Sequence, residues 1–182
     1  IDSSTLMNKV FEVIEAKKIF NISIKKIKIL INPNSYVHAI IIFKNGIIKI
    51  LAHETKMDIP IFNSIYGDYS NLTYNTKKLN LDKINNLNFT EPNLKKFNNL
   101  NILKLIPIKD SLFETAVITI NDEIVNKFLL KKIKYNEISI YINKIINFKI
   151  FKKYCKIKPK SIGQIFEVRD LAIKYVNGYI KK

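Results

Sequence analysis

Polar side chains near the start of the chain have the types and the spacing to bind a phosphate group and a divalent cation. Asn8, Glu12 and Glu15 recur at intervals of four and three residues, with Lys9 beside them and hydroxyl residues just before, at positions 3–5. Residues at this spacing share one face of a helix. A helix start with hydroxyl, amide and ammonium groups suits a phosphate, and a carboxylate one turn further along can hold a hard cation through oxygen.

The same residues also fit a simpler interpretation, in which they form only the solvated face of an amphipathic helix. Lys9 and Glu12 would then be an exposed pair that contributes roughly 0.2–0.5 kcal/mol. Both interpretations require a helix over residues 6–20, whose N-terminus the hydroxyl residues are expected to cap. Apolar side chains at helical spacing support this helix: Leu6, Val10, Val13, Ile14 and Ala16.

A longer string that contains these residues resembles the signature of a known enzyme family. Residues 4–16 read S-T-L-M-N-K-V-F-E-V-I-E-A, which is similar to the signature of 1-deoxy-D-xylulose 5-phosphate reductoisomerase. The resemblance implies that Glu12 is a metal-binding carboxylate and that Ser3 and Asn8 hold the substrate and its phosphate. It also implies that Lys9 contacts the substrate and supplies positive charge to its oxygens, so that Lys9 and Glu12 are the catalytic pair.

Later blocks of the sequence resemble the same family in the same order. The block INPNSYVHA contains His38, which we interpret as a hydrogen-bonded structural residue rather than a metal ligand, because a zinc site would need further ligands nearby. In a block similar to the family's L-N-A-A-N-E, Asp122 and Glu123 are adjacent and therefore point apart on a helix, so we expect structural or helix-terminal roles for both. The similar blocks lie at residues 31–39, 55–61, 88–100 and 118–142.

The resemblance implies an NADPH- and metal-dependent enzyme of non-mevalonate isoprenoid biosynthesis. Its substrate would be a sugar phosphate, 1-deoxy-D-xylulose 5-phosphate, which is rearranged and reduced to 2-C-methyl-D-erythritol 4-phosphate, with Mg²⁺ or Mn²⁺ as the Lewis acid. The family's other metal carboxylates are absent from this sequence. The four glycines of the sequence are scattered and form no dinucleotide-binding fingerprint. We therefore expect the C-terminal half of a homodimeric enzyme, inactive by itself. Whether the NADPH domain is encoded upstream, supplied by another chain or lost stays open.

The amino-acid composition limits which other classes of function are possible. The net charge of +16 raises nucleic acid as a partner, but the lysines are spread along the chain without a basic motif, so we expect none. The alternatives kept are a decayed, non-catalytic homologue and a basic nucleic-acid-binding module. A single cysteine, Cys155, excludes an internal disulfide and indicates a reducing compartment, the cytoplasm or else a plastid-type organelle. No apolar run approaches the roughly 20 residues that span a bilayer, so we expect no membrane partner.

The predicted fold is α+β, with a small hairpin-containing sheet packed on helices and a C-terminal helical bundle. Strands are expected at 27–31, 37–43 and 47–53, the last two joined through Asn45-Gly46, a strong hairpin signal. The unbroken apolar character of these two strands predicts coverage of both faces, by helices or at a homodimer interface.

Periodicity also predicts the remaining helices and the domain boundaries. Helices are expected at 61–66, 114–131, 136–146 and 161–180, with a turn at 32–35 and a basic connector at 152–160. The expected domains are a catalytic and connective part at 1–66, a linker at 67–98 and a helical domain at 99–182.

Overall fold

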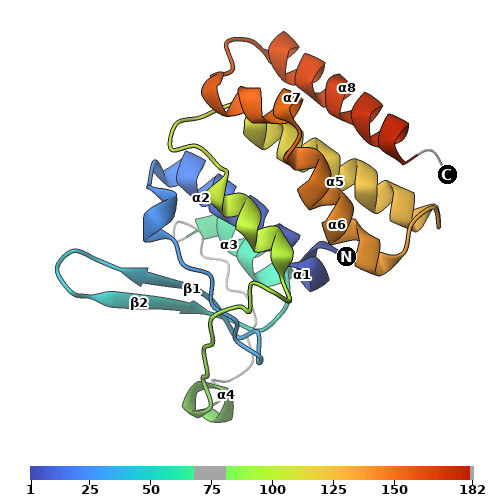
Figure 1. Ribbon diagram of the computed structural model, residues 1–182. Coiled ribbons are helices and arrows are strands. Elements are labelled where there is room, and N and C mark those ends of the chain that lie inside the picture. Colours follow the sequence, from blue (N-terminus) through green and yellow to red (C-terminus); the bar gives the residue numbers. More distant parts are fainter. Residues whose placement is uncertain (68–80, 181–182) are drawn as a thin grey trace. The chain divides into compact units, whose positions relative to one another are not determined.

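The structure is a computed structural model that describes residues 1–67 and 81–180 (Figure 1). Its contacts divide the chain into two compact units. The helical unit consists of Ile1–Ile29 and Asn93–Lys182, and the hairpin unit consists of Leu30–Pro92. Each unit is described by itself.

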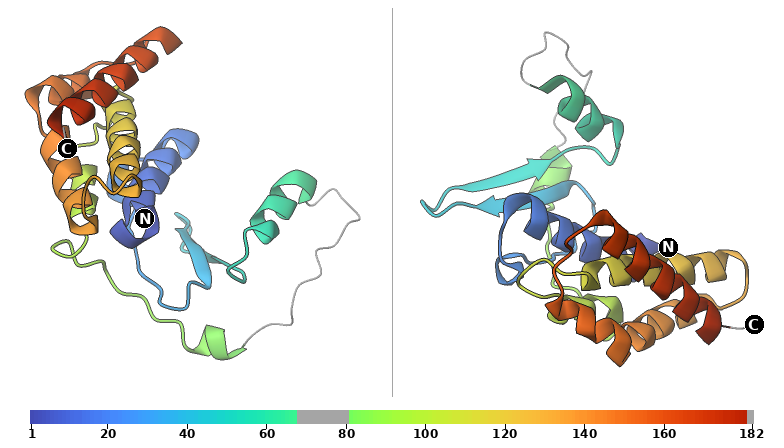
Figure 2. Two further views of the ribbon diagram at one scale, coloured as in Figure 1. Left: turned by 90° about the vertical axis from the view of Figure 1, so that its right-hand side faces the viewer. Right: turned by 90° about the horizontal axis from the view of Figure 1, so that it is seen from above.

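The helical unit contains one long central helix with others packed on it. Helix α5 contacts both α6 and α8, and the two views of Figure 2 show these three helices as neighbours. The elements of this unit are α1 (Asp2–Thr5), α2 (Met7–Phe20), η1 (Ile24–Lys26), η3 (Asn98–Lys104), α5 (Phe113–Leu129), α6 (Tyr135–Ile146), α7 (Lys149–Lys152), η4 (Lys153–Lys156) and α8 (Ile162–Tyr179).

The core of the helical unit lies between these helices and consists mainly of aliphatic side chains. The buried residues of each helix recur at intervals of three or four, as a buried helical stripe requires. Fully buried examples are Met7 and Val10 of α2, Phe113, Val117, Ile120 and Ile124 of α5, Ile138, Ile142 and Ile145 of α6, and Ala172 and Val176 of α8. The predicted helices at 6–20, 114–131, 136–146 and 161–180 are therefore confirmed to within a few residues.

The hairpin unit contains the only sheet among the described residues. Strands β1 (Val37–Ile42) and β2 (Ile48–Ala52) pair antiparallel, with Ile42 opposite Ile48. Gly46 adopts a φ of 86° in the connecting turn, a conformation that glycine adopts at little cost. The predicted hairpin is confirmed, and with it the α+β class.

Two short helices complete the hairpin unit. Helix α3 (Asp58–Tyr66) begins three residues before the predicted start at 61, and α4 (Leu81–Asn85) lies within the segment predicted to be a linker. Residues 68–80 of that linker lie outside the described residues. The domain boundaries predicted at 66/67 and 98/99 stay predictions, whereas the contacts place the first 29 residues in the same unit as the C-terminal helices.

The predicted strand at 27–31 was wrong. Residues 27–30 form no strand, because the N–H of Ile27 closes a 3₁₀ turn onto the carbonyl of Ile24, and only Ile31 pairs, as an isolated bridge with Thr90. The basic connector at 152–160 is partly helical, since Lys152 ends α7 and η4 follows it directly. Local composition predicted extended chain at 27–31, but a ladder needs a second strand beside it.

Candidate functional site

The predicted site residues Lys9 and Glu12 form an ion pair across the first two turns of α2. The Lys9 Nζ lies 2.8 Å from Glu12 Oε2 and 3.0 Å from Oε1, so the ammonium spans both carboxylate oxygens. The two side chains are 37% and 53% exposed, respectively. An exposed pair three residues apart stabilises a helix only slightly, so the helix does not depend on these charges.

Asn8 joins this pair and has an oxygen without a partner. Its Nδ2 donates to Glu12 Oε1 at 3.4 Å, while its Oδ1 is buried and accepts no hydrogen bond from any described residue. A buried acceptor without a donor costs free energy, so native structures rarely leave one unpaired. This oxygen can accept a hydrogen bond from a hydroxyl of a ligand, from a water molecule or from another segment of the protein.

The chain enters α2 through a break that the sequence did not reveal. Leu6 has a φ of 55° and separates α1 from α2, and its N–H bonds back to the carbonyl of Ser3 at 3.3 Å. The Oγ of Ser4 donates to the carbonyl of Ile1 at 2.7 Å, and the Oγ1 of Thr5 donates to that of Asp2 at 3.3 Å.

The prediction that these hydroxyls cap α2 is therefore wrong, because their hydrogen bonds are made within α1 and α2 has no side-chain cap. Ser3 is exposed on α1, and no bond from its side chain to Asn8, Lys9 or Glu12 is found among the described residues. The structure brings Asn8, Lys9 and Glu12 together and leaves Ser3 on the preceding turn.

A second polar contact, between Asp2 of α1 and Asn121 of α5, holds α1 in place, and the sequence alone did not reveal it. Asn121 of α5 is 1% exposed, and its Nδ2 donates to both carboxylate oxygens of Asp2, at 3.3 and 3.4 Å. Its Oδ1 is buried and has no partner among the described residues. Partial burial, with a smaller contribution from the negative charge of Asp2, raises the pKa of the neighbouring Asp122. No spacing signal could have found this contact, because the residues lie 119 positions apart.

The chain's own residues fit only part of a divalent metal site. Glu12 offers a half-exposed carboxylate, but no group of three His, Cys, Asp or Glu residues that could hold a metal occurs among the described residues. The Lys9 ammonium already occupies both oxygens of Glu12, so a cation bound there would displace it. Glu12 can therefore be one ligand of a site whose other oxygens come from elsewhere.

The two histidines of the hairpin unit stack on each other. The ring centroids of His38 and His53 lie 3.7 Å apart, the Nε2 of His38 lies 3.2 Å from the carbonyl of His53, and the Nδ1 of His53 lies 2.6 Å from the carbonyl of Glu54. These contacts agree with the interpretation of His38 as a structural residue.

No helix within residues 1–67 and 81–180 has the length and apolar character that crossing a membrane requires.

Comparisons with known proteins agree on one family. The family model described as "DXP reductoisomerase C-terminal domain" matches residues 53–175. A protein of Pelagibacter ubique named 1-deoxy-D-xylulose 5-phosphate reductoisomerase is 46% identical over 170 residues, which cover 93% of this chain and 44% of that protein. One of Persephonella marina with the same name is 38% identical over 156 residues, or 84% of this chain and 41% of that protein.

The solved structures lead to the same family. A crystal structure titled DOX-P reductoisomerase in complex with NADPH, fosmidomycin and magnesium has a TM-score of 0.85 and 25% identity, and the match covers 99% of this chain and 45% of that one. The chain thus spans less than half the length of the relatives that it matches.

Proposed function

Because the chain belongs to the 1-deoxy-D-xylulose 5-phosphate reductoisomerase family, we propose that it is part of an enzyme that converts 1-deoxy-D-xylulose 5-phosphate into 2-C-methyl-D-erythritol 4-phosphate. The reaction rearranges the carbon skeleton of a ketose phosphate and reduces the resulting aldehyde with a hydride from NADPH. The observation that carries the proposal is the convergence of an ammonium, a carboxylate and an unpaired amide oxygen on one face of α2.

The residues of this cluster have separate roles in the proposed reaction. Ser3 and Asn8 hold the substrate and its phosphate by hydrogen bonds, and the Asn8 Oδ1 that lacks a partner accepts one from a substrate hydroxyl. Lys9 places its positive charge beside the substrate oxygens. Glu12 would supply one oxygen ligand to Mg²⁺, or to Mn²⁺ as an alternative, and the cation would act as a Lewis acid on the substrate. NADPH and the other metal ligands would be held by parts of the enzyme outside this chain.

Lys9 and Glu12 also form an exchangeable pair in this proposal. The Lys9 ammonium neutralises Glu12 at 2.8 Å when no cation is bound. A divalent cation on Glu12 would repel the ammonium, which is then free to turn toward the substrate. Because both side chains are partly exposed, this movement requires no change in the core. Binding of the metal to Glu12 would thus release the Lys9 ammonium, one turn of helix away, to bind the substrate.

The test uses the protein at full length and follows NADPH oxidation with 1-deoxy-D-xylulose 5-phosphate and Mg²⁺. Glu12→Gln keeps the size of the side chain but removes its charge, so turnover should fall about 100-fold or more, with only partial rescue by Mn²⁺. Lys9→Ala should raise KM about tenfold without weakening metal affinity. Glu15→Gln, an exposed carboxylate one turn further along α2, is the matched control and should stay within about twofold of wild type.

The outcomes separate this proposal from the alternatives. If Glu12→Gln turned over at the wild-type rate, Glu12 would not be a metal ligand, and the polar residues of α2 would be only the solvated face of an amphipathic helix. A full-length wild type without turnover would favour a decayed homologue, and a strongly salt-dependent affinity for DNA or RNA would favour a nucleic-acid-binding module. The chain without the rest of the enzyme should show no activity.

We also propose that the enzyme is a homodimer and that the hairpin contributes to its interface. The pairs Ile40–Ile50 and Ile42–Ile48 are directly opposite in register and therefore share one face, which presents four isoleucines. Ile42 is 74% exposed and Ile48 is 58% exposed. An exposed apolar face of a sheet is unfavourable in water and typical of an interface.

Light scattering of the full-length protein after size exclusion tests the dimer. Ile48→Lys should shift the mass to that of a monomer at micromolar concentration, whereas Leu129→Lys, an equally exposed position at the end of α5, should leave it unchanged. A monomeric wild type would refute the dimer.

We also propose that the protein is located in the cytoplasm, with a plastid-type organelle as the alternative. The sequence has a single cysteine, which suits a reducing compartment.

A further inference from the structure

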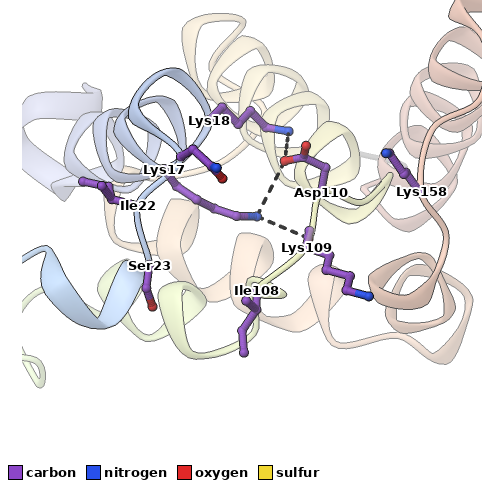
Figure 3. A pocket seen from close by; sticks show the side chains of 9 residues that line it. Lys17, Lys18, Ile22, Ser23, Ile108, Lys109, Asp110 and Lys158 are labelled. Carbon is purple, nitrogen blue, oxygen red and sulfur yellow. Dashed lines mark hydrogen bonds and ion pairs between the residues drawn. The ribbon is translucent and has the colours of Figure 1, made fainter.

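A cavity at the C-terminal end of α2 is unusually rich in lysine. It has a volume of about 410 Å³ and lies entirely within the helical unit, between α2, residues 108–110 and Lys158. Four lysines, one carboxylate and the hydroxyl of Ser23 are among the residues that line it (Figure 3). This volume is in the range of sites for small molecules, roughly 300–1,000 Å³.

Two of the four lysines are already neutralised by carboxylates. Lys17 Nζ lies 2.7 Å from Glu114 Oε1, and Lys18 Nζ lies 3.2 Å from Asp110 Oδ1 and 3.7 Å from Glu114 Oε2. Figure 3 shows Lys17 and Lys18 extending from α2 toward Asp110. These two cations and two anions cancel, and the pair of Lys17, which lines the cavity, with Glu114 behind it is buried.

The other two lysines, Lys109 and Lys158, leave the cavity with two uncompensated positive charges. Neither forms an ion pair with any residue in the described part of the chain, and both are exposed at the rim. An anion bound in the cavity would be attracted by both ammonium groups.

Hydrogen bonds hold the backbone at both of these lysines. Lys17 Nζ donates to the carbonyl of Lys109 at 3.3 Å, and the N–H of Leu112 donates to the carbonyl of Ile157 at 2.8 Å, one residue before Lys158. The two ammonium groups therefore extend from anchored segments, which lowers the entropy lost when they close on a ligand.

We propose that this cavity binds the phosphate group of a small phosphorylated molecule, with Lys109 and Lys158 as its charged ligands. A phosphate carries close to two negative charges, which matches the two unpaired ammonium groups, and the hydroxyl of Ser23 lines the same cavity. The site is separate from the cluster around Lys9, because Lys17 lies eight residues further along α2, about 12 Å at 1.5 Å per residue. It goes beyond the proposed reaction and does not depend on it.

Calorimetric titration of the full-length protein with inorganic phosphate, at fixed ionic strength, tests the site. Lys109→Gln/Lys158→Gln removes both charges and keeps most of the side-chain length, and it should weaken phosphate binding at least tenfold. The matched control Lys132→Gln/Lys174→Gln removes two exposed charges of the same unit away from the cavity and should change binding less than twofold. Both double variants alter exposed positions, so their melting temperatures should equal that of wild type.

One further variant makes the result decisive. Asp110→Asn removes the carboxylate at the rim that repels an anion and leaves Lys18 with only its longer contact of 3.7 Å to Glu114, so phosphate should bind at least threefold more tightly. The proposal is overturned by a wild type that binds no phosphate, or by equal weakening in the two lysine pairs, which would indicate only the general charge of the chain.

Discussion

The buried ion pair between Lys17 and Glu114 joins α2 to the start of α5, and its removal should destabilise the helical unit strongly. The two side chains are 6% and 3% exposed, and their charged atoms lie 2.7 Å apart. Glu114 also accepts hydrogen bonds from the N–H of Ser111 at 2.8 Å and from its Oγ at 3.2 Å. The carboxylate is thus fully engaged, and so is the ammonium through the carbonyl of Lys109.

The distance sets the scale of the effect. At an effective dielectric constant of about 20, opposite unit charges at this separation attract by about 6 kcal/mol, and desolvation of both groups offsets much of that. Removal of one partner leaves the other buried with only a longer contact, to Lys18 at 3.7 Å for Glu114 and to Asp110 at 3.9 Å for Lys17. Breaking a buried pair in this way costs about 3–5 kcal/mol. We therefore expect Lys17→Met and Glu114→Gln each to lower the free energy of unfolding by about that amount. The double variant should cost about as much as one single variant.

Urea unfolding followed by far-UV circular dichroism measures this double-mutant cycle. The coupling energy should be about 2 kcal/mol or more. The matched control is the exposed pair Lys9–Glu12 on the same helix, where Lys9→Met and Glu12→Gln should show a coupling below about 1 kcal/mol. Additive effects of Lys17→Met and Glu114→Gln, or single variants within about 1 kcal/mol of wild type, would refute the reasoning.

Three smaller predictions concern single positions. Ser161→Ala removes a hydroxyl that accepts from the N–H of Gln164 at the start of α8, and it should cost about 1 kcal/mol in chemical unfolding, whereas an unchanged midpoint would contradict the cap. Gly46→Val places a branched side chain at a φ of 86°, so the free energy of unfolding should fall by at least about 1 kcal/mol and the melting temperature should drop. An unaltered melting temperature would mean that the turn adapts to the side chain. Burial raises the pKa of the Cys155 thiol, so alkylation in the folded protein should be slower than in urea at the same pH. Because the folded state favours the protonated thiol, the stability that this thiol contributes should be lost as the pH rises through its raised pKa. Equal alkylation rates would show that the thiol is open to solvent.

The sequence by itself determined the features that depend on neighbouring residues. The spacing of Asn8, Lys9 and Glu12 predicted one shared helix face, and all three side chains meet there, because positions three and four apart are adjacent on any α-helix. Asn45-Gly46 between two apolar runs predicted the hairpin for the same local reason. The contiguous string at residues 4–16 carried the family resemblance, which the comparisons confirmed.

Local signals failed at two segments of the chain. Residues 3–5 have the composition of a helix cap, yet their hydroxyls bond within α1, and Leu6 breaks the helix. The apolar residues 27–31 have the composition of a strand, but no neighbouring strand continues the single bridge at Ile31. In both cases the residue types permitted more than one structure.

Only the tertiary structure decided which distant charges meet. Lys17 and Glu114 lie 97 positions apart, and nothing in the spacing of either helix indicates that they pair. The contact of Asn121 with Asp2 and the placement of Lys109 and Lys158 around one cavity arise in the same way, from the packing of α1, α2, α5 and the segment before α8. Helical geometry determines which residues share a face, whereas the burial of apolar surface determines which faces come together.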